Sequence, residues 1–314
     1  MINTLYQIIR TARPRQWLKS VSVFAAPFFA GKLFDADIWG VTLEAFFAFC
    51  FMSSAAYFLN DMVDAPKDKI HPVKKNRPIA SGKLSIWLAS LIALALAVGS
   101  VIYASIYIGF YFTLILIAYA VIQLSYSFYL RDVIIVDSLV VASGFVLRVF
   151  AGGLASSVSI SSWLALTTIG ISLLLAFGKR RSEKTLVKKF FHTEGSDTRK
   201  TLAHYPDALL DSMISMSATY TIITYSLFTF QISTQNTGAK LLTVLPSILK
   251  SPKWMMLTIP LVIYGVARYL YAIYETQDGE SPERVLLSDK PLLFTVILWV
   301  SFVLAVIYLL PRIS

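Results

Sequence analysis

The chain has 314 residues, of which 56% are hydrophobic and 15% are charged, and its mean hydropathy is +0.67. Soluble domains average about 25% charged residues, so this composition excludes a water-soluble globular protein and indicates a polytopic helical membrane protein. The apolar runs are continuous rather than alternating, which excludes a transmembrane β-barrel. The net charge of +10 favours anionic lipids or substrates over nucleic acid, because the cations gather in a few loops.

Nine apolar segments follow one another along the chain, each near the roughly 20 residues that a helix needs to cross a bilayer. They predict an all-α bundle of nine membrane helices in one integral-membrane domain, residues 1–314. The weakest division is at Tyr107-Ile108-Gly109, between the third and fourth segments. The expected spans are 17–34, 39–59, 84–106, 108–129, 134–155, 160–178, 212–233, 254–274 and 291–310.

The distribution of lysine and arginine predicts the orientation of the helices. The N-terminus and the loops after the second, fourth, sixth and eighth spans hold 21 of the 28 cations. These regions are therefore expected on the cytoplasmic side of a cell membrane. The long loops 60–83, 179–211 and 275–290 lie on this side and also hold most of the acids, so we expect the functional site there. The alternative is that these loops only retain positive charge.

The end of the second span carries an acidic motif, Asn60-Asp61-x-x-Asp64-x-x-x-Asp68. If the helix continues, Asp61, Asp64 and Asp68, here called the aspartate stripe, fall on one face at spacing i, i+3, i+7, and Asn60 falls beside them. Oxygen ligands of this kind suit Mg²⁺, which binds through one or two carboxylates plus substrate phosphates. The motif therefore predicts a site for a Mg-diphosphate.

Two observations bear on that interpretation. Pro66 is expected to end or kink the helix near Ala65, which would put Asp68 on a following turn. The simpler alternative is a charged helix end with a solvated loop. Aspartates at a helix C-terminus oppose the helix dipole, however, and residues that oppose local preference favour a functional role.

The acidic motif and the following stretch Lys75-Asn-Arg-Pro-Ile-Ala-Ser-Gly82 resemble the first aspartate-rich motif of the UbiA-type intramembrane prenyltransferase superfamily. The resemblance implies a helical bundle around a cavity that opens to the cytoplasm. Members of that superfamily that act on aromatic acceptors carry a second aspartate motif after the sixth span. In this chain that place reads Phe177-Gly-Lys-Arg-Arg-Ser-Glu-Lys184, and such a basic run is expected to bind a bare phosphate directly and not to collect a second Mg²⁺.

This departure resembles the decaprenyl-phosphate phosphoribosyltransferase branch. Other matching stretches are 13–19, 126–131 with Asp137, 143–153 and 279–289. The resemblance implies Mg²⁺-dependent transfer of 5-phosphoribose from phosphoribosyl pyrophosphate to a polyprenyl phosphate, for cell-envelope glycan precursors. A homo-oligomer is compatible with the sequence, which does not fix the oligomeric state.

The candidate site residues follow from these motifs. Asn60 and the aspartate stripe are the expected metal and diphosphate ligands. Asp61, Asp64 and Asp137 are the candidate catalytic residues, although Asp137 could instead be an ordinary acid at a helix N-terminus. The remaining candidates would bind substrate phosphate or sugar, and several could instead be interfacial cations: Arg15, Gln16, Lys19, Lys75, Arg77, Tyr126, Arg131, Lys179 and Arg180.

Two other functions remain open at this stage. A UbiA-type prenyltransferase would move a prenyl group from a prenyl diphosphate to a small acceptor. A transporter would place ionisable residues near the bilayer midplane, and only Arg148 fits that pattern. Arg148 could form a structural pair or line a lipid path, and Cys50 is expected to be a packing residue.

Overall fold

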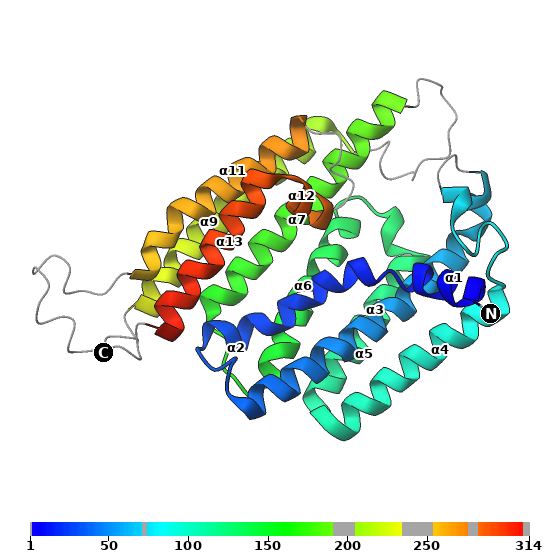
Figure 1. The fold of residues 1–314 in the computed structure, drawn as a ribbon. Helices are drawn as coiled ribbons and strands as arrows, with labels where there is room; N and C mark the ends of the chain where they lie inside the picture. The colour runs from blue at the N-terminus through cyan, green and yellow to red at the C-terminus, as the bar shows by residue number, and fades with distance from the viewer. Residues whose placement is uncertain (1, 71–73, 191–204, 234–253, 276–281, 310–314) are drawn as a thin grey trace, which may run out of the picture. The chain divides into compact units, whose positions relative to one another are not determined.

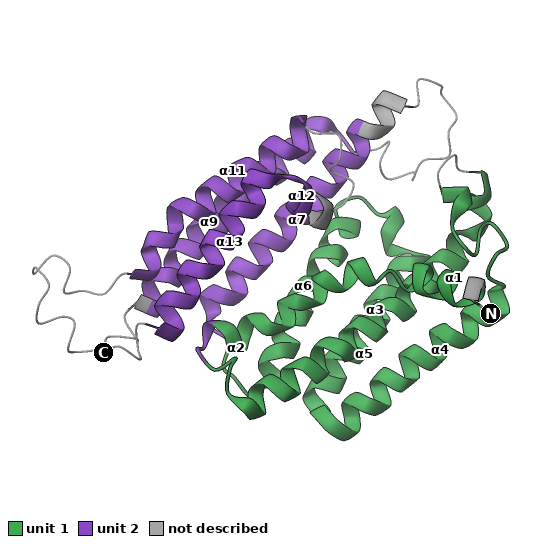
Figure 2. Ribbon diagram, in the orientation of Figure 1, with its two compact units in different colours: residues 1–28, 32–159, 193–204 green, residues 29–31, 160–192, 205–314 purple. Residues whose placement is uncertain are grey.

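The structure is a computed structural model that describes residues 2–70, 74–190, 205–233, 254–275 and 282–309. Every regular element in these ranges is helical, which confirms the predicted fold class (Figure 1). The chain divides into two compact units, described separately below (Figure 2). The prediction of one integral-membrane domain over residues 1–314 stays a prediction.

Unit 1 contains residues 1–28, 32–159 and 193–204. Its helices are α1 (Ile2–Ala12), the 3₁₀ helix η1 (Pro14–Phe24), most of α2 (Ala25–Phe29), α3 (Ala36–Ile70), η2 (Lys74–Asn76), α4 (Ile86–Tyr103), the π-helical turn η3 (Ala104–Ile108), α5 (Phe110–Phe128), η4 (Leu130–Asp132) and α6 (Val136–Ala155). Helix α3 is the central element, because it packs against η1, α4, α5 and α6.

The core of unit 1 combines aromatic side chains with small residues that allow close helix packing. Phe49 on α3 packs edge-on against Phe112 and Tyr119 of α5. At Gly152 of α6, an added Cβ would lie 1.8 Å from the carbonyl oxygen of Val23, so only glycine allows α6 to approach η1 this closely.

Unit 2 contains residues 29–31, 160–192 and 205–314. Its helices are α7 (Ser162–Phe190), α9 (Asp207–Ser233), η6 (Trp254–Thr258), α11 (Ile259–Glu275), α12 (Pro282–Ser288), α13 (Lys290–Leu304) and the π-helical turn η7 (Ala305–Leu309). Helix α7 packs along most of α9, and Tyr225 of α9 is bound both by Thr258 and by the indole of Trp299.

Seven of the nine expected spans correspond to described helices that are long and apolar enough to cross a membrane. Residues 17–34 instead contain η1 and the short α2, and residues 212–233 lie in α9, a helix of 27 residues. The count of nine spans therefore stays a prediction. The weak division at Tyr107-Ile108-Gly109 is confirmed, because Gly109 separates η3 from α5 with φ +134°.

Two helices extend beyond the expected spans. Helix α3 continues through Pro66 to Ile70, so it does not end at Ala65, and Asp68 lies on the same helix rather than on a following turn. Helix α7 continues to Phe190 although the apolar run ends near 178. A helix can leave the bilayer and continue with a charged surface, because its backbone hydrogen bonds do not depend on hydropathy. Much of the expected loop after residue 178 is therefore helical, and residues 191–204 lie outside the described part.

Candidate functional site

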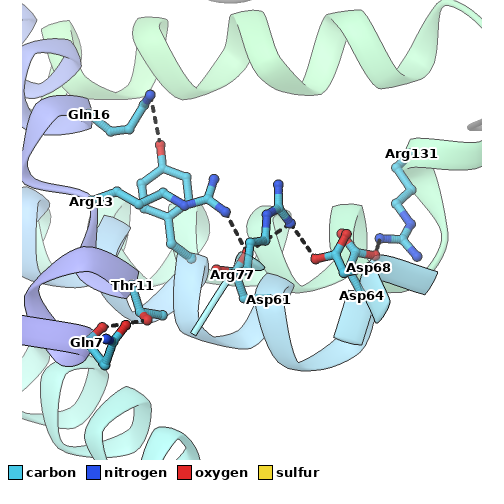
Figure 3. Close-up of polar contacts among 10 residues, drawn as sticks. Gln7, Thr11, Arg13, Gln16, Asp61, Asp64, Asp68, Arg77 and Arg131 are labelled. Carbon is cyan, nitrogen blue, oxygen red and sulfur yellow. Dashed lines mark hydrogen bonds and ion pairs between the residues drawn. The ribbon is translucent and has the colours of Figure 1, made fainter. Parts of the chain in front are cut away.

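The aspartate stripe lies on one helix of unit 1, as its spacing predicts. Asp61 and Asp68 are almost fully buried, whereas the side chain of Asp64 keeps 17% of its exposure. Three buried or half-buried carboxylates on one face repel each other unless cations lie among them. The structure shows which cations do so (Figure 3).

Each carboxylate of the stripe is bound by an arginine from elsewhere in unit 1. Arg77 follows the turn η2, and its Nη1 atom donates to Asp61 Oδ1 at 3.2 Å and to Asp68 Oδ2 at 2.7 Å. Arg131 of η4 donates to Asp64. One guanidinium nitrogen thus lies between two carboxylates of the stripe, at the kind of position that a bound cation would take (Figure 3).

Arg13 also lies at the aspartate stripe, and the sequence analysis did not name it as a candidate site residue. Its Nη2 atom donates to Asp61 Oδ1 at 2.5 Å, and its guanidinium lies over the ring of Tyr57 at 5.1 Å. Two signals point toward it in the sequence: it begins the matching stretch 13–19, and three carboxylates on one helix face require a comparable number of cations. Nothing in the order of residues selects Arg13 over its neighbour Arg15, which is exposed.

The backbone at two places beside the site is strained. Arg13 has φ +53° and Ile135, just before α6, has φ +69°. Such conformations cost non-glycine residues on the order of 1–3 kcal/mol and persist where the surrounding structure imposes them. Arg13 carries a side chain of the site, and Ile135 separates Arg131 from Asp137, which is buried in the first turn of α6.

Asn60 offers one further ligand atom. Its side-chain oxygen is buried and accepts no hydrogen bond from the residues that the structure describes. Leaving such an oxygen unsatisfied costs about 1–3 kcal/mol, so a cation or a donor is expected there. Within the described ranges, no three histidine, cysteine or acidic residues lie close enough together to form a metal site by themselves. One or two carboxylates and the Asn60 oxygen still fit Mg²⁺, because substrate phosphates complete its shell.

Comparison with known proteins agrees with this geometry. The sequence profile of the UbiA prenyltransferase family matches residues 20–185, more than half of the chain. This chain belongs to the UbiA prenyltransferase family. The resemblance inferred from the acidic motif is therefore confirmed.

Two curated relatives of this UbiA-family chain are named decaprenyl-phosphate phosphoribosyltransferase. The protein from Corynebacterium glutamicum is 33% identical over 309 residues, which cover 97% of this chain and 87% of the relative. The protein from Mycolicibacterium smegmatis is 33% identical over 310 residues, 98% of this chain and 94% of the relative. The UbiA homolog from Archaeoglobus fulgidus bound to DMAPP and Mg²⁺ has a TM-score of 0.66 at 20% identity, covers 96% of this chain and 99% of that chain, and so shows the shared fold.

The other candidates in unit 1 lie at different depths. Gln16 accepts a hydrogen bond from Tyr57 at 3.5 Å, which brings it close to Arg13. Lys19 and Tyr126 are half-buried, and Lys75 is exposed. The structure therefore brings Arg77 and Arg131 directly to the stripe of this UbiA-family chain, while substrate contacts of the remaining candidates stay predictions.

The basic run of unit 2 is engaged with acids. Arg180 is buried and donates to Glu183 at 2.6 Å, and Lys179 lies 3.8 Å from the same carboxylate. Arg181 binds Asp211 at 2.8 Å on α9. A phosphate role for Lys179 and Arg180 stays a prediction.

Arg148 is buried in unit 1 and held by neutral groups. Its guanidinium donates to the carbonyl oxygen of Gly144 at 2.6 Å, to Ser53 at 2.8 Å, to Tyr119 at 2.9 Å and to Ser20 at 3.4 Å. No carboxylate pairs with it in the part of the chain that the structure describes. The four contacts join η1, α3, α5 and α6, which favours a structural role. Cys50 is buried, as a packing residue would be.

Proposed function

We propose that this chain transfers 5-phosphoribose from phosphoribosyl pyrophosphate to a polyprenyl phosphate and releases pyrophosphate. The observation that carries the proposal is the aspartate stripe with the unsatisfied oxygen of Asn60, at the end of a membrane helix of a UbiA-family protein. The names of the curated relatives support this donor and acceptor over others.

The donor suits the residues because it carries a diphosphate at C1 and a separate phosphate at C5. Asn60 and the stripe would hold Mg²⁺ and the diphosphate. When bound, Mg²⁺ would neutralise the charge that builds on the departing pyrophosphate. The basic run with Lys179 and Arg180 matches a bare phosphate in charge, and its one carboxylate, Glu183, is paired with Arg180.

The reaction is a displacement at the anomeric carbon. An oxygen of the acceptor phosphate forms a bond to C1 while the C1–oxygen bond to pyrophosphate breaks, and the electron pair leaves with the pyrophosphate. The acceptor is already ionised near neutral pH, so the chain need not supply a general base. Arginines that orient the two phosphates, and Asp137 near the sugar, would act by positioning and electrostatic stabilisation.

The acceptor is a lipid, which agrees with an integral membrane protein. We propose that the N-terminus and the donor site face the cytoplasm, where a charged sugar donor is available, and that the lipid enters from the membrane. The excess of lysine and arginine in the corresponding loops supports this orientation. A homo-oligomer is compatible with the proposal.

The test is a membrane assay with radiolabelled phosphoribosyl pyrophosphate and decaprenyl phosphate, with added Mg²⁺ or with EDTA. We expect label in the lipid fraction that depends on the metal. A parallel reaction offers labelled prenyl diphosphate and small acceptors. Prenyl transfer without phosphoribosyl transfer, from the same folded preparation, would replace the proposed activity by that of a prenyltransferase.

A further inference from the structure

Arg13 competes for the carboxylate that the proposed metal site requires. Asp61 is 2% exposed and is bound by two arginines, Arg13 at 2.5 Å and Arg77 at 3.2 Å. Both use the same oxygen, Oδ1. A metal ion that approaches this oxygen must displace at least one guanidinium, because a cation repels another cation at contact distance.

The two arginines are about equally exposed, but Arg13 binds one carboxylate of the stripe. Arg77 bridges Asp61 and Asp68, so its release would break two ion pairs. Arg13 would lose its pair with Asp61 and keep its stacking on Tyr57. Its side chain is 28% exposed, which leaves it room to turn toward a ligand that arrives at the stripe.

The segment around Arg13 is fastened to α3 on both sides, which fixes where the guanidinium can reach. Ser54 donates to the carbonyl oxygen of Ala12 at 2.9 Å and accepts from the indole nitrogen of Trp17 at 3.0 Å. Arg13 itself has left-handed backbone angles, φ 53° and ψ 61°. Because the backbone on both sides of Arg13 is anchored, only the Arg13 side chain can move, and its guanidinium stays in the neighbourhood of Asp61.

We propose that Arg13 is a positioning residue of the donor site: it neutralises Asp61 in the metal-free protein and passes to the diphosphate when metal and donor bind. A metal ion that binds alone would take Asp61 and leave Arg13 without an anionic partner. A metal ion that binds together with its diphosphate would provide Arg13 with a new anion to pair with. Metal and diphosphate would consequently bind cooperatively. This inference rests on the proposed function, since it assumes a metal-diphosphate at the stripe.

The test measures Mn²⁺, a spectroscopic substitute for Mg²⁺, bound to the full-length purified protein, from the free-ion signal in electron paramagnetic resonance. Titrations are made with and without inorganic pyrophosphate, for wild type, Arg13→Gln and Arg10→Gln. Arg10 is a matched control, because it is an exposed cation on α1 whose loss changes the net charge equally. No ion pair of Arg10 occurs among the described residues.

Without pyrophosphate, we expect Arg13→Gln to bind Mn²⁺ on the order of fivefold more tightly than wild type, the size of one partly exposed ion pair. With pyrophosphate, the gain in affinity should be smaller than in wild type, because the arginine that responds to the anion is missing. Arg10→Gln should follow wild type in both titrations. Equal Mn²⁺ affinities and equal pyrophosphate effects in wild type and Arg13→Gln would overturn the inference.

Two further variants separate the possible failures. Asp64→Asn should weaken Mn²⁺ binding in the presence of pyrophosphate, and if it does not, the proposed donor site itself is wrong. If Arg13→Gln does not yield folded protein, Arg13→Met replaces it in the same comparison. Methionine removes the charge and keeps an unbranched apolar side chain, so it should also bind Mn²⁺ more tightly than wild type, and wild-type behaviour in both titrations would count against the role of Arg13.

Discussion

Arg131, in the short helix η4, forms an ion pair with Asp64 of α3, 67 residues earlier in the chain. This pair ties the connection between α5 and α6 to the middle carboxylate of the aspartate stripe. Asp64 is also the most exposed of the three carboxylates. A substitution at Asp64 should therefore affect the site more than the fold.

Asp64→Asn should lower phosphoribosyl transfer by about a hundredfold or more, the size of effect seen when one group that stabilises a developing charge is removed. The measurement is the initial rate of label transfer to the lipid fraction at saturating Mg²⁺. Asp132→Asn is the control, because Asp132 is an exposed acid next to Arg131 and is not part of the stripe. Equal rates in Asp64→Asn and wild type would remove Asp64 from the site.

Arg148 should contribute to stability rather than to the reaction. Arg148→Ala leaves a cavity and removes the N–H groups that donate to Ser53, Tyr119 and the Gly144 carbonyl oxygen. We therefore expect the free energy of unfolding to fall by roughly 2–4 kcal/mol. Arg148→Met fills most of the volume and introduces no buried charge, so it should be less damaging. Thermal unfolding in detergent compares them. A stable Arg148→Met protein without transferase activity would instead assign Arg148 a role toward a substrate.

The close approach of α6 and η1 predicts a strong effect at Gly152. Gly152→Ala would place a methyl group inside contact distance of the Val23 backbone, which cannot move as a side chain can. We expect severe destabilisation, more than about 3 kcal/mol, or no folded protein. Gly99→Ala is the matched control in α4, because an added Cβ meets nothing within 4 Å there, and it should be neutral or slightly stabilising. Protein yield and melting temperature provide the comparison.

Asp289 combines two roles at the start of α13. It accepts hydrogen bonds from Arg268 Nε at 3.0 Å and from Arg268 Nη2 at 2.9 Å, and it caps the helix by accepting from the backbone N–H of Leu292 at 2.9 Å. Asp289→Asn keeps a capping oxygen, whereas Asp289→Ala removes it, so Asp289→Ala should be less stable than Asp289→Asn by about 1 kcal/mol. Thermal melts of the two variants measure the cap together with the hydrogen bond that the same oxygen accepts from Arg268. Equal melting temperatures would show that the cap contributes nothing.

The same carboxylate predicts a pH dependence of stability. The hydrogen bonds from Arg268 hold the pKa of Asp289 below its ordinary value of 3.8. A lowered pKa means that the unfolded chain binds the proton more readily, so the contribution is present above pH 3.8 and is lost as the pH falls through the folded value. Wild type should therefore lose more stability on acidification in this range than Asp289→Asn. Parallel acid-unfolding curves for the two proteins would contradict this.

The sequence predicts those parts of the structure that depend on local pattern. The stripe on α3 follows from the spacing of three aspartates, and the break at Gly109 follows from a residue that tolerates positive φ. Helix ends are predicted less well. Hydropathy indicates which residues lie in the membrane, whereas a helix ends where its backbone hydrogen bonding stops. The segment 14–24 forms a 3₁₀ helix, and its β-branched and serine residues give it low α-helical propensity.

Contacts between distant residues are not available from such patterns. The pairing of Arg13 with Asp61 depends on a left-handed residue directly before Pro14, a conformation that the sequence disfavours. The neutral surroundings of Arg148 likewise depend on four separate helices meeting at one point. Sequence reasoning found the carboxylates and two of their arginines, Arg77 and Arg131, and could not assign which carboxylate each arginine binds.

Pro66, inside α3, changes the backbone of the stripe itself. Proline has no N–H group, so the carbonyl oxygen of Met62, four residues earlier, receives no helical hydrogen bond from it. The part of α3 between Asp61 and Asp68 therefore has one backbone hydrogen bond fewer than a regular helix of the same length. Helices bend most easily at such places. Asp61 and Asp68, which share the Nη1 atom of Arg77, lie on either side of this weakened part of the helix. A bend at Pro66 would therefore change the distance between the two carboxylates.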